Sequence, residues 1–304
     1  MTREQDIEDA RHAMVRDLVD RRLIRTPAVE RAFRCVPRHA FLPAPYIVST
    51  DSLLVECEET DDPCRVYNDL AVALTPDSRV TSCAPSLLAA EIEQLAPVEG
   101  MRLLHVGTGS GYATAILAEL VGERGTVVGI EYDEDLAELS ATQLARMGVT
   151  TATVRQGDGT LGVPEAAPFD RILVSPGVAD IAPSWILQLD EEGTLVLPLC
   201  PAGPLAQRVS GGTLLTVQKR GESLWGQLST TAFFVPLQGL LTPAASASER
   251  LADGLARWFA LEDFLRTDLP IRIALKSLRM STPDPRSVPW SLETPNAMMW
   301  IEPS

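Results

Sequence analysis

The sequence predicts an α/β fold with a mostly parallel, doubly wound sheet that ends in an antiparallel edge. Two observations lead to this prediction. Between residues 86 and 240, short apolar runs alternate with segments of helical periodicity, which is the order of strand–helix–strand units. A glycine-rich turn joins the first apolar run to the helix after it, so that a buried strand passes directly into a helix.

The chain is expected to divide into two domains. The first covers residues 1–240, with N-terminal helices and a substrate loop in residues 1–85 and a Rossmann-like core in residues 86–240. The pattern changes after Pro243, so residues 241–304 are expected to form a C-terminal α/β extension.

The N-terminal region has helical periodicity over residues 5–35. Thr26 lies in the N-cap position of its second helix, and Pro27 lies in the first helical position. Prolines interrupt the chain after this helix, and residues 50–82 show no regular pattern. The acidic stretch 56–63 is expected to be a solvated loop.

The core is expected to alternate strands with helices, and the alternation implies helices on both faces of the sheet. The expected strands cover residues 101–107, 125–131, 151–158, 169–175 and 193–199. The expected helices cover residues 85–96, 112–120, 133–147 and 182–189. Residues 213–237 predict two antiparallel edge strands, and the extension predicts a helix at 246–266, a strand at 271–280 and an irregular segment at 281–290.

Charge and cysteine usage exclude several classes of protein. A net charge of −15 argues against nucleic-acid binding, which depends on Lys and Arg. The N-terminus is too charged for a signal peptide, and no apolar run is long enough to span a membrane. The five cysteines are scattered without Cys-x-x-Cys spacing, which predicts neither a disulfide framework nor a metal site. We therefore expect a cytoplasmic protein that binds neither nucleic acid nor membrane.

The glycine turn has the spacing Gly107, Gly109 and Gly111. A dinucleotide site has the pattern Gly-x-Gly-x-x-Gly, and Tyr112 occupies the position of its third glycine here. A phosphate-binding P-loop is excluded, because no Gly-Lys-Ser/Thr follows the turn. The turn alone is also compatible with a purely structural role.

Two acids narrow the choice of ligand. Glu131 ends the second strand, 20 residues after Gly111, and can accept hydrogen bonds from both hydroxyl groups of a ribose. Asp158 follows the third strand and is placed to bind an adenine amino group. A glycine turn, a ribose acid and an adenine acid in this order describe S-adenosyl-L-methionine, which has no pyrophosphate. Without such a ligand, Glu131 would be an ordinary surface acid.

His105 lies inside the first strand, where it either binds the polar end of the cofactor or is a structural histidine with satisfied hydrogen bonds. Backbone amides near Gly107 and Gly109 are expected to hold the methionine part of the cofactor. The expected cofactor site, which would release S-adenosylhomocysteine as product, comprises His105, Gly107, Thr108, Gly109, Gly111, Tyr112, Glu131, Tyr132, Gly157, Asp158 and Gly159.

Several segments together resemble the protein-L-isoaspartate O-methyltransferases, in the same order along the chain. They are VPRHAFLP (36–43), VGTGSGYATAILA (106–118), GDGTLGVPEAAPFDRILVS (157–175), GTLVLPL (193–199) and FFVPLQG (233–239). The resemblance implies a Rossmann-like methyltransferase fold that binds S-adenosylmethionine. It also implies methylation of a carboxyl group on an aspartyl or isoaspartyl residue.

The chain departs from the family in its substrate loop. The family's Ile-Ser-Gln-Pro segment falls on Ser82, Cys83, Ala84 and Pro85, so a thiol, which is a weak hydrogen-bond donor, stands at the hydroxyl position. Ser82 could take over this role, or Cys83 could simply fill space. The expected catalytic residues are Ser82 and Cys83. The expected substrate-binding residues are Tyr67, Ser82, Cys83, Pro85, Ser86 and Pro176.

Residues 66–86 and the C-terminal extension resemble the branch of this family that modifies ribosomally made peptides. The main expectation is therefore methylation of an aspartate in a cyclised precursor peptide, followed by closure of the ester to an aspartimide. The alternatives are repair of isoaspartyl or D-aspartyl protein and a non-catalytic protein that binds the cofactor and a peptide. A substrate carboxylate is ionised at neutral pH, so methyl transfer needs alignment rather than a general base.

Overall fold

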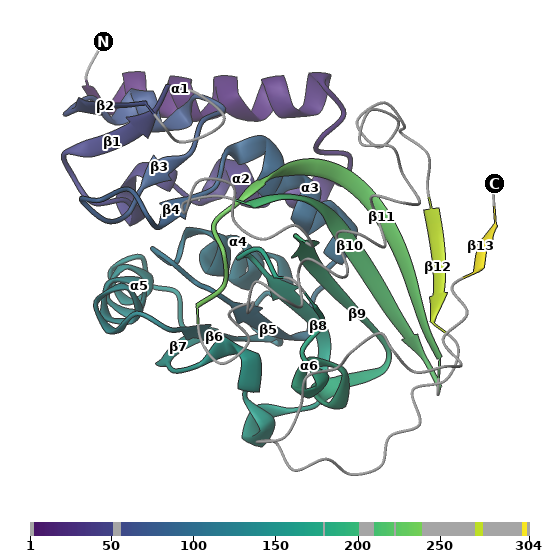
Figure 1. The fold of residues 1–304 in the computed structure, drawn as a ribbon. Helices are drawn as coiled ribbons and strands as arrows, with labels where there is room; N and C mark the ends of the chain where they lie inside the picture. Colours follow the sequence, from purple (N-terminus) through teal and green to yellow (C-terminus); the bar gives the residue numbers. More distant parts are fainter. Residues whose placement is uncertain are drawn as a thin grey trace.

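The computed structural model describes residues 3–50, 56–178, 180–200, 210–221, 223–238, 271–275 and 300–302. A nine-stranded sheet in the order β13-β12-β11-β10-β9-β8-β5-β6-β7 forms the centre of the fold (Figure 1). Its parallel part contains β5 (Arg102–Val106), β6 (Thr126–Glu131), β7 (Ala152–Gln156), β8 (Phe169–Val174) and β9 (Leu189–Leu199). These strands confirm the expected doubly wound core.

The helices cover both faces of the sheet. Successive residues of β5 point to opposite faces, since Leu103 packs into one buried cluster and Leu104 into the other. The cluster with Leu103 includes side chains of α3 (Pro85–Leu95), α4 (Tyr112–Val121) and α5 (Glu134–Arg146), whereas α6 (Pro183–Gln188) packs into the cluster with Leu104. The expected core helices are therefore confirmed.

The N-terminal region forms a separate layer beside the core (Figure 1). Its helices are α1 (Arg3–Asp20), α2 (Pro27–Cys35), η1 (Arg38–Phe41) and η2 (Pro63–Tyr67). Its small sheet has the order β2-β1-β3-β4, with β1 (Tyr46–Ser49), β2 (Cys57–Thr60), β3 (Val72–Ala73) and β4 (Thr81–Ser82). Thr26 is the N-cap residue of α2, but its hydroxyl donates to Glu93 instead of capping the helix.

The expectation of a solvated loop at residues 56–63 was wrong. Residues Cys57–Thr60 form β2, which pairs with β1 in antiparallel register. Backbone pairing outweighs the acidic composition here, because β2 lies at the edge of the small sheet and keeps Glu58 and Glu59 exposed to solvent.

The antiparallel edge of the main sheet consists of a hairpin and two C-terminal strands. The expected hairpin is present as β10 (Ser210–Arg220) and β11 (Ser223–Phe234). From the extension, β12 (Ile271–Leu275) pairs with β11, and β13 (Trp300–Glu302) pairs with β12. The expected helix at 246–266 and the irregular segment at 281–290 lie outside the described residues. Within the described ranges, no helix is both long enough and apolar enough to cross a membrane.

The strand order reverses between β5 and β8, because β6 and β7 follow β5 on one side while β8 and β9 lie on the other. At such a point, the loops that leave the two neighbouring strands diverge and open a crevice at their carboxyl ends. The crevice is the position at which this fold class binds ligands.

Candidate functional site

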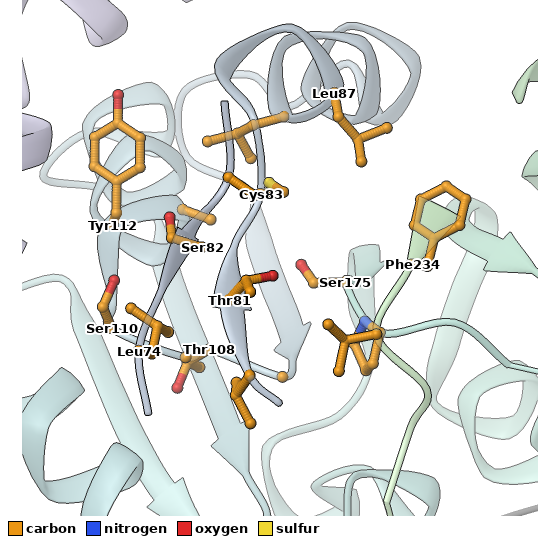
Figure 2. Close-up of a pocket in the computed structure, with 18 of the residues that line it drawn as sticks. Leu74, Thr81, Ser82, Cys83, Leu87, Thr108, Ser110, Tyr112, Ser175 and Phe234 are labelled. Atoms are coloured by element: carbon orange, nitrogen blue, oxygen red, sulfur yellow. The ribbon is translucent and has the colours of Figure 1, made fainter. Parts of the chain in front are cut away.

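A cavity of about 590 Å³ opens at the carboxyl ends of β5, β6 and β8 (Figure 2). One wall, here called the glycine side, consists of residues 106–109, 131–133 and 159. The opposite wall consists of Leu74, residues 80–84 around β4 and residues 86–88 of α3. It is here called the hairpin side after the antiparallel pair β3–β4, which is distinct from the β10–β11 hairpin. Ser175 and Pro176, which follow β8, lie between the two walls, and residues 234–238 close the cavity after β11.

The glycine turn packs tightly against the loop that follows β8. Gly107 has a φ of 79°, in the left-handed region that favours glycine. A Cβ atom at this position would lie 2.6 Å from Cδ of Pro176, so a side chain would also collide with the neighbouring loop. Glycine is therefore required here for both conformation and close approach.

Glu131 is the only carboxylate of the glycine side that lies deep in the protein among the described residues, with 8% of the residue exposed. One of its oxygens accepts a hydrogen bond from the amide of Gly109 at 2.8 Å, and the other accepts from the amides of Tyr132 at 2.9 Å and Asp133 at 3.3 Å. Burial raises the pKa of Glu131, while these three backbone N–H groups oppose the rise. Since a carboxylate has about four acceptor positions, at least one remains for a ligand hydroxyl.

Two amides in the region expected to bind methionine are already used within the protein. The amide of Gly107 donates to the carbonyl of Ile130 at 2.8 Å, and that of Gly109 donates to Glu131. The predicted contact between amides of this region and methionine stays a prediction. Thr108 also lines the cavity, and its hydroxyl is buried and has no hydrogen-bond partner among the described residues.

Asp158 has a local structural role. One oxygen of its carboxylate accepts from the amide of Thr160 at 2.9 Å and from the hydroxyl of Thr160 at 2.7 Å, which caps the short helix η3 (Gly159–Leu161). Neither Asp158 nor Gly157 lines the cavity, whereas Gly159 does. The predicted contact between Asp158 and adenine stays a prediction.

His105 is completely buried inside β5 and does not line the cavity. Its Nδ1 lies 2.8 Å from the hydroxyl of Thr114, and its Nε2 lies 2.9 Å from the hydroxyl of Ser175. Burial lowers the pKa of His105 to about 4, so the ring is neutral at physiological pH. Of the two roles expected from the sequence, these contacts fit the structural histidine with satisfied hydrogen bonds.

The hairpin side places Ser82, Cys83 and Ser86 in the cavity wall. Ser82 ends β4, and Figure 2 shows its side chain on the opposite face of the strand from that of Thr81. Burial raises the pKa of the Cys83 thiol well above its ordinary value, so Cys83 is a neutral thiol at physiological pH. Tyr67 lies elsewhere, with its hydroxyl 2.7 Å from Nδ1 of His39.

Taken together, the structure brings most of the expected site residues into one cavity. Those that line it are Ser82, Cys83, Ser86, Gly107, Thr108, Gly109, Tyr112, Glu131, Tyr132, Gly159 and Pro176. Those that do not are Tyr67, Pro85, His105, Gly111, Gly157 and Asp158. Pro85 and Gly111 instead stand at the starts of α3 and α4, where they shape the chain beside the cavity.

Buried Arg38 and half-buried Asp69, from distant elements, hold the hairpin side. Arg38 lies in one of the segments that carry the resemblance, but the sequence analysis assigned neither residue a role in the site. A nitrogen of the Arg38 guanidinium, which is completely buried, donates to the carbonyl of Cys83 at 2.8 Å and to that of Leu70 at 3.2 Å. Its charge lies 5.8 Å from the ring centre of Tyr112. Asp69 accepts from the amide of Ser86 at 2.9 Å and pairs with Arg21, which follows α1.

Ser175 and Thr81 also line the cavity, although the sequence analysis did not select them. The position of Ser175 could have pointed to it, because it follows directly after the strand that neighbours β5 across the reversal of strand order. Nothing in the local pattern distinguishes Thr81, since its strand contains two residues.

These features fit an adenosyl ligand. The glycine side combines a buried acid with spare acceptor capacity, an unpartnered hydroxyl on Thr108 and the ring of Tyr132, which is 46% exposed. In the described part of the chain, no group of three or more His, Cys, Asp or Glu side chains is arranged to hold a metal ion.

Comparison with known proteins identifies the family. Residues 9–241 match the family described as Protein-L-isoaspartate(D-aspartate) O-methyltransferase (PCMT). The chain belongs to this family. It is accordingly an S-adenosylmethionine-dependent protein carboxyl methyltransferase, as expected from the resemblance.

Relatives and solved structures agree with this assignment. The chain is 34% identical to a protein-L-isoaspartate O-methyltransferase of Pyrobaculum neutrophilum, over 75% of this chain and 98% of the relative. It is 36% identical to protein-L-isoaspartate O-methyltransferase 1 of Rhodopseudomonas palustris, over 80% of this chain and 89% of the relative.

Among solved structures, a protein-L-isoaspartate O-methyltransferase aligns with a TM-score of 0.64 at 28% identity, over 76% of this chain and 67% of that one. A Plasmodium falciparum structure in complex with S-adenosyl-L-homocysteine shares the fold, with a TM-score of 0.59 at 20% identity, over 75% of this chain and 97% of that one.

Proposed function

We propose that this chain transfers the methyl group of S-adenosylmethionine to the free carboxylate of an isoaspartyl residue in a peptide or protein. The observation that carries this proposal is a single cavity whose glycine side suits an adenosyl ligand and whose hairpin side faces it with small polar side chains. The family match and the relatives' names support isoaspartate as the acceptor.

The glycine side would hold the cofactor through three groups. Glu131 would accept hydrogen bonds from ribose hydroxyls, Tyr132 would offer a flat apolar surface to the adenine, and Thr108 would pair its buried hydroxyl. When bound, S-adenosylmethionine supplies an electrophilic methyl group on a positively charged sulfur.

The residues of this chain would act on the acceptor by orienting it and excluding water. An aspartyl-type carboxylate is ionised at neutral pH, with a pKa of about 3.9, so no side chain needs to remove a proton from it. Ser82 on the hairpin side would donate a hydrogen bond that aligns the carboxylate, and Leu74, Leu87 and Phe234 would keep water away.

A second candidate is methylation of an ordinary aspartate in a cyclised precursor peptide, whose ester then closes to an aspartimide. Two observations favour it. Cys83 stands where the resemblance places the family's substrate-holding hydroxyl, and residues 242–304 lie beyond the family match. Both candidates use the same first step, since in each an ester forms on a carboxylate and later loses methanol to a neighbouring amide.

Paired peptides would separate the two candidates. The purified protein is incubated with methyl-labelled S-adenosylmethionine and with linear peptides of identical sequence that carry either isoaspartate or aspartate. Ester formation on isoaspartyl peptides of unrelated sequences supports the main proposal. Methylation confined to the aspartate of a cyclised peptide would replace it with the second candidate. Absence of S-adenosylhomocysteine with every peptide would contradict both.

A further inference from the structure

Ser175 holds a special position in the cavity. It follows β8 at the reversal of strand order and lies between the glycine side and the hairpin side. Its amide donates to the carbonyl of Val106 at 3.0 Å, which fixes its backbone to the end of β5. Figure 2 shows Ser175 among the side chains that line the cavity, and its hydroxyl oxygen lies 2.9 Å from Nε2 of His105.

His105 controls the direction in which the Ser175 hydroxyl can donate. The ring is neutral, so one of its nitrogens carries a proton and the other accepts one. If Nε2 carries the proton, it donates to Ser175 while Thr114 donates to Nδ1. The Ser175 O–H is then free to donate into the cavity. If Nδ1 carries the proton, Ser175 donates to Nε2 and shows the cavity only its lone pairs.

We propose that Ser175 is a second hydrogen-bond donor to the acceptor carboxylate and that His105, acting through Ser175, is its positioning residue. This inference rests on the proposed function, because it assumes that a carboxylate is bound between the two walls. An anionic acceptor selects the arrangement in which Nε2 of His105 donates and the Ser175 O–H points into the cavity. In that arrangement, no buried donor or acceptor of the chain Thr114–His105–Ser175 is left without a partner.

The arrangement also favours release of the product. A hydrogen bond from a hydroxyl to an ionised carboxylate is about twice as strong as one between neutral groups. Methylation converts the carboxylate into a neutral ester, which weakens the bond from Ser175.

The test compares Ser175→Ala with wild type in two assays. The first measures kcat and KM for a synthetic isoaspartyl peptide, with the matching aspartyl peptide in parallel. The second measures the Kd of S-adenosylhomocysteine by calorimetry. Because a hydrogen bond to a charged group is lost, kcat/KM for the peptide that wild type methylates should fall about 10- to 100-fold. The Kd of S-adenosylhomocysteine should stay within about twofold of wild type, a change too small to register as a lost hydrogen bond.

Ser140→Ala is the matched control. Ser140 is completely buried, whereas Ser175 is half-buried, and Ser140 lies in α5 and does not line the cavity. Its loss should leave kcat/KM within about twofold of wild type, because no substrate contact is removed.

His105→Gln and His105→Leu test the positioning role. Glutamine can still donate to Ser175 and accept from Thr114, so it should restore most of the activity that leucine loses, with a difference of about 3- to 10-fold in kcat/KM. Both variants should bind S-adenosylhomocysteine like wild type, and this binding also reports that they are folded. Equal activity of the two variants would show that His105 does not position Ser175.

Two other outcomes would overturn the inference. If Ser175→Ala methylates the peptide as fast as wild type, Ser175 is not a donor to the acceptor. If the variant loses affinity for S-adenosylhomocysteine by the same factor as it loses kcat/KM, Ser175 serves the cofactor instead. A wild-type protein that forms no ester on either peptide would refute the proposed function itself, and this inference with it.

Discussion

The two walls of the cavity are built in different ways. The glycine side stands on the ends of parallel strands of five and six residues, and Glu131 fixes it by accepting three backbone amides from within 22 residues of chain. The hairpin side stands on β3 and β4, which contain two residues each. It is fixed by Arg38 and Asp69, which bind backbone groups up to 45 residues away.

Because the two walls are held by different contacts, they should respond differently to substitutions. The glycine side is specified by short-range contacts and is expected to stay intact when the hairpin side is disturbed. The hairpin side depends on a few long-range hydrogen bonds, so single substitutions there should change substrate recognition and stability together. The following predictions test this separation.

The largest effect is expected from Arg38→Met. Methionine fills much of the volume but leaves the carbonyls of Leu70 and Cys83 without their buried donor, which should lower the free energy of unfolding by about 2–4 kcal/mol. Urea unfolding measures this change. Arg34→Met, which breaks a partly exposed pair with Glu30, is the control and should cost less than about 1 kcal/mol. Equal losses in the two variants would show that Arg38 does not hold the hairpin side.

Glu131→Ala should have the next largest effect, and on the glycine side alone. Removal of a buried acceptor for ribose hydroxyls should weaken binding of S-adenosylhomocysteine about 100-fold, measured by calorimetry. Glu134→Ala, at an exposed position in the first turn of α5, serves as the control. Unchanged affinity in Glu131→Ala would show that the cofactor does not bind on the glycine side.

Glu91 should make stability depend on pH. It lies in α3 beneath the hairpin side, and burial raises its pKa from 4.5 to about 8. The folded state therefore holds a proton that the unfolded state releases between these two values, so the free energy of unfolding should fall as pH rises from 4.5 to 8.

In Glu91→Gln that fall should be reduced by about 1–2 kcal/mol, because glutamine does not titrate. Denaturant unfolding at several pH values measures the slope. Glu99→Gln, at an exposed position, controls for the loss of one acid. A pH slope that is the same in wild type and Glu91→Gln would contradict the prediction.

Ser82→Ala should give the smallest effect. Loss of one hydroxyl on the hairpin side should reduce kcat/KM for the peptide about tenfold, at the low end of the range for a hydrogen bond to a charged group, and leave the Kd of S-adenosylhomocysteine unchanged. Steady-state kinetics and calorimetry on the same protein batch measure the two quantities. A parallel loss in both would mean that the two walls are not independent at this position.

The same contrast explains how much could be predicted from the sequence. The core strands, the glycine turn and Glu131 follow local periodicity and fixed spacing, so the sequence predicts their places in the fold. The hairpin side could not be predicted in this way. Its strands are too short to show a period, and the contacts of Arg38 depend on residues that only the folded chain brings together.

One wrong expectation and one unexpected contact have the same origin. Residues 57–60 form a strand because β1 supplies a pairing partner, which the acidic composition does not reveal. The amides of Gly107 and Gly109 donate to Ile130 and Glu131, and a spacing rule cannot show which donors are already used. In each case the partner lies in another strand and is absent from the local pattern.

The close approach of Gly107 to Pro176 has an evolutionary consequence. A methyl group at residue 107 would press on the proline ring and displace its neighbour, Ser175. Mutation at this one turn would thus disturb the binding of both reactants at once. Descendants of this protein can diversify the residues that recognise a peptide, but we expect this point of contact to resist change in every one of them.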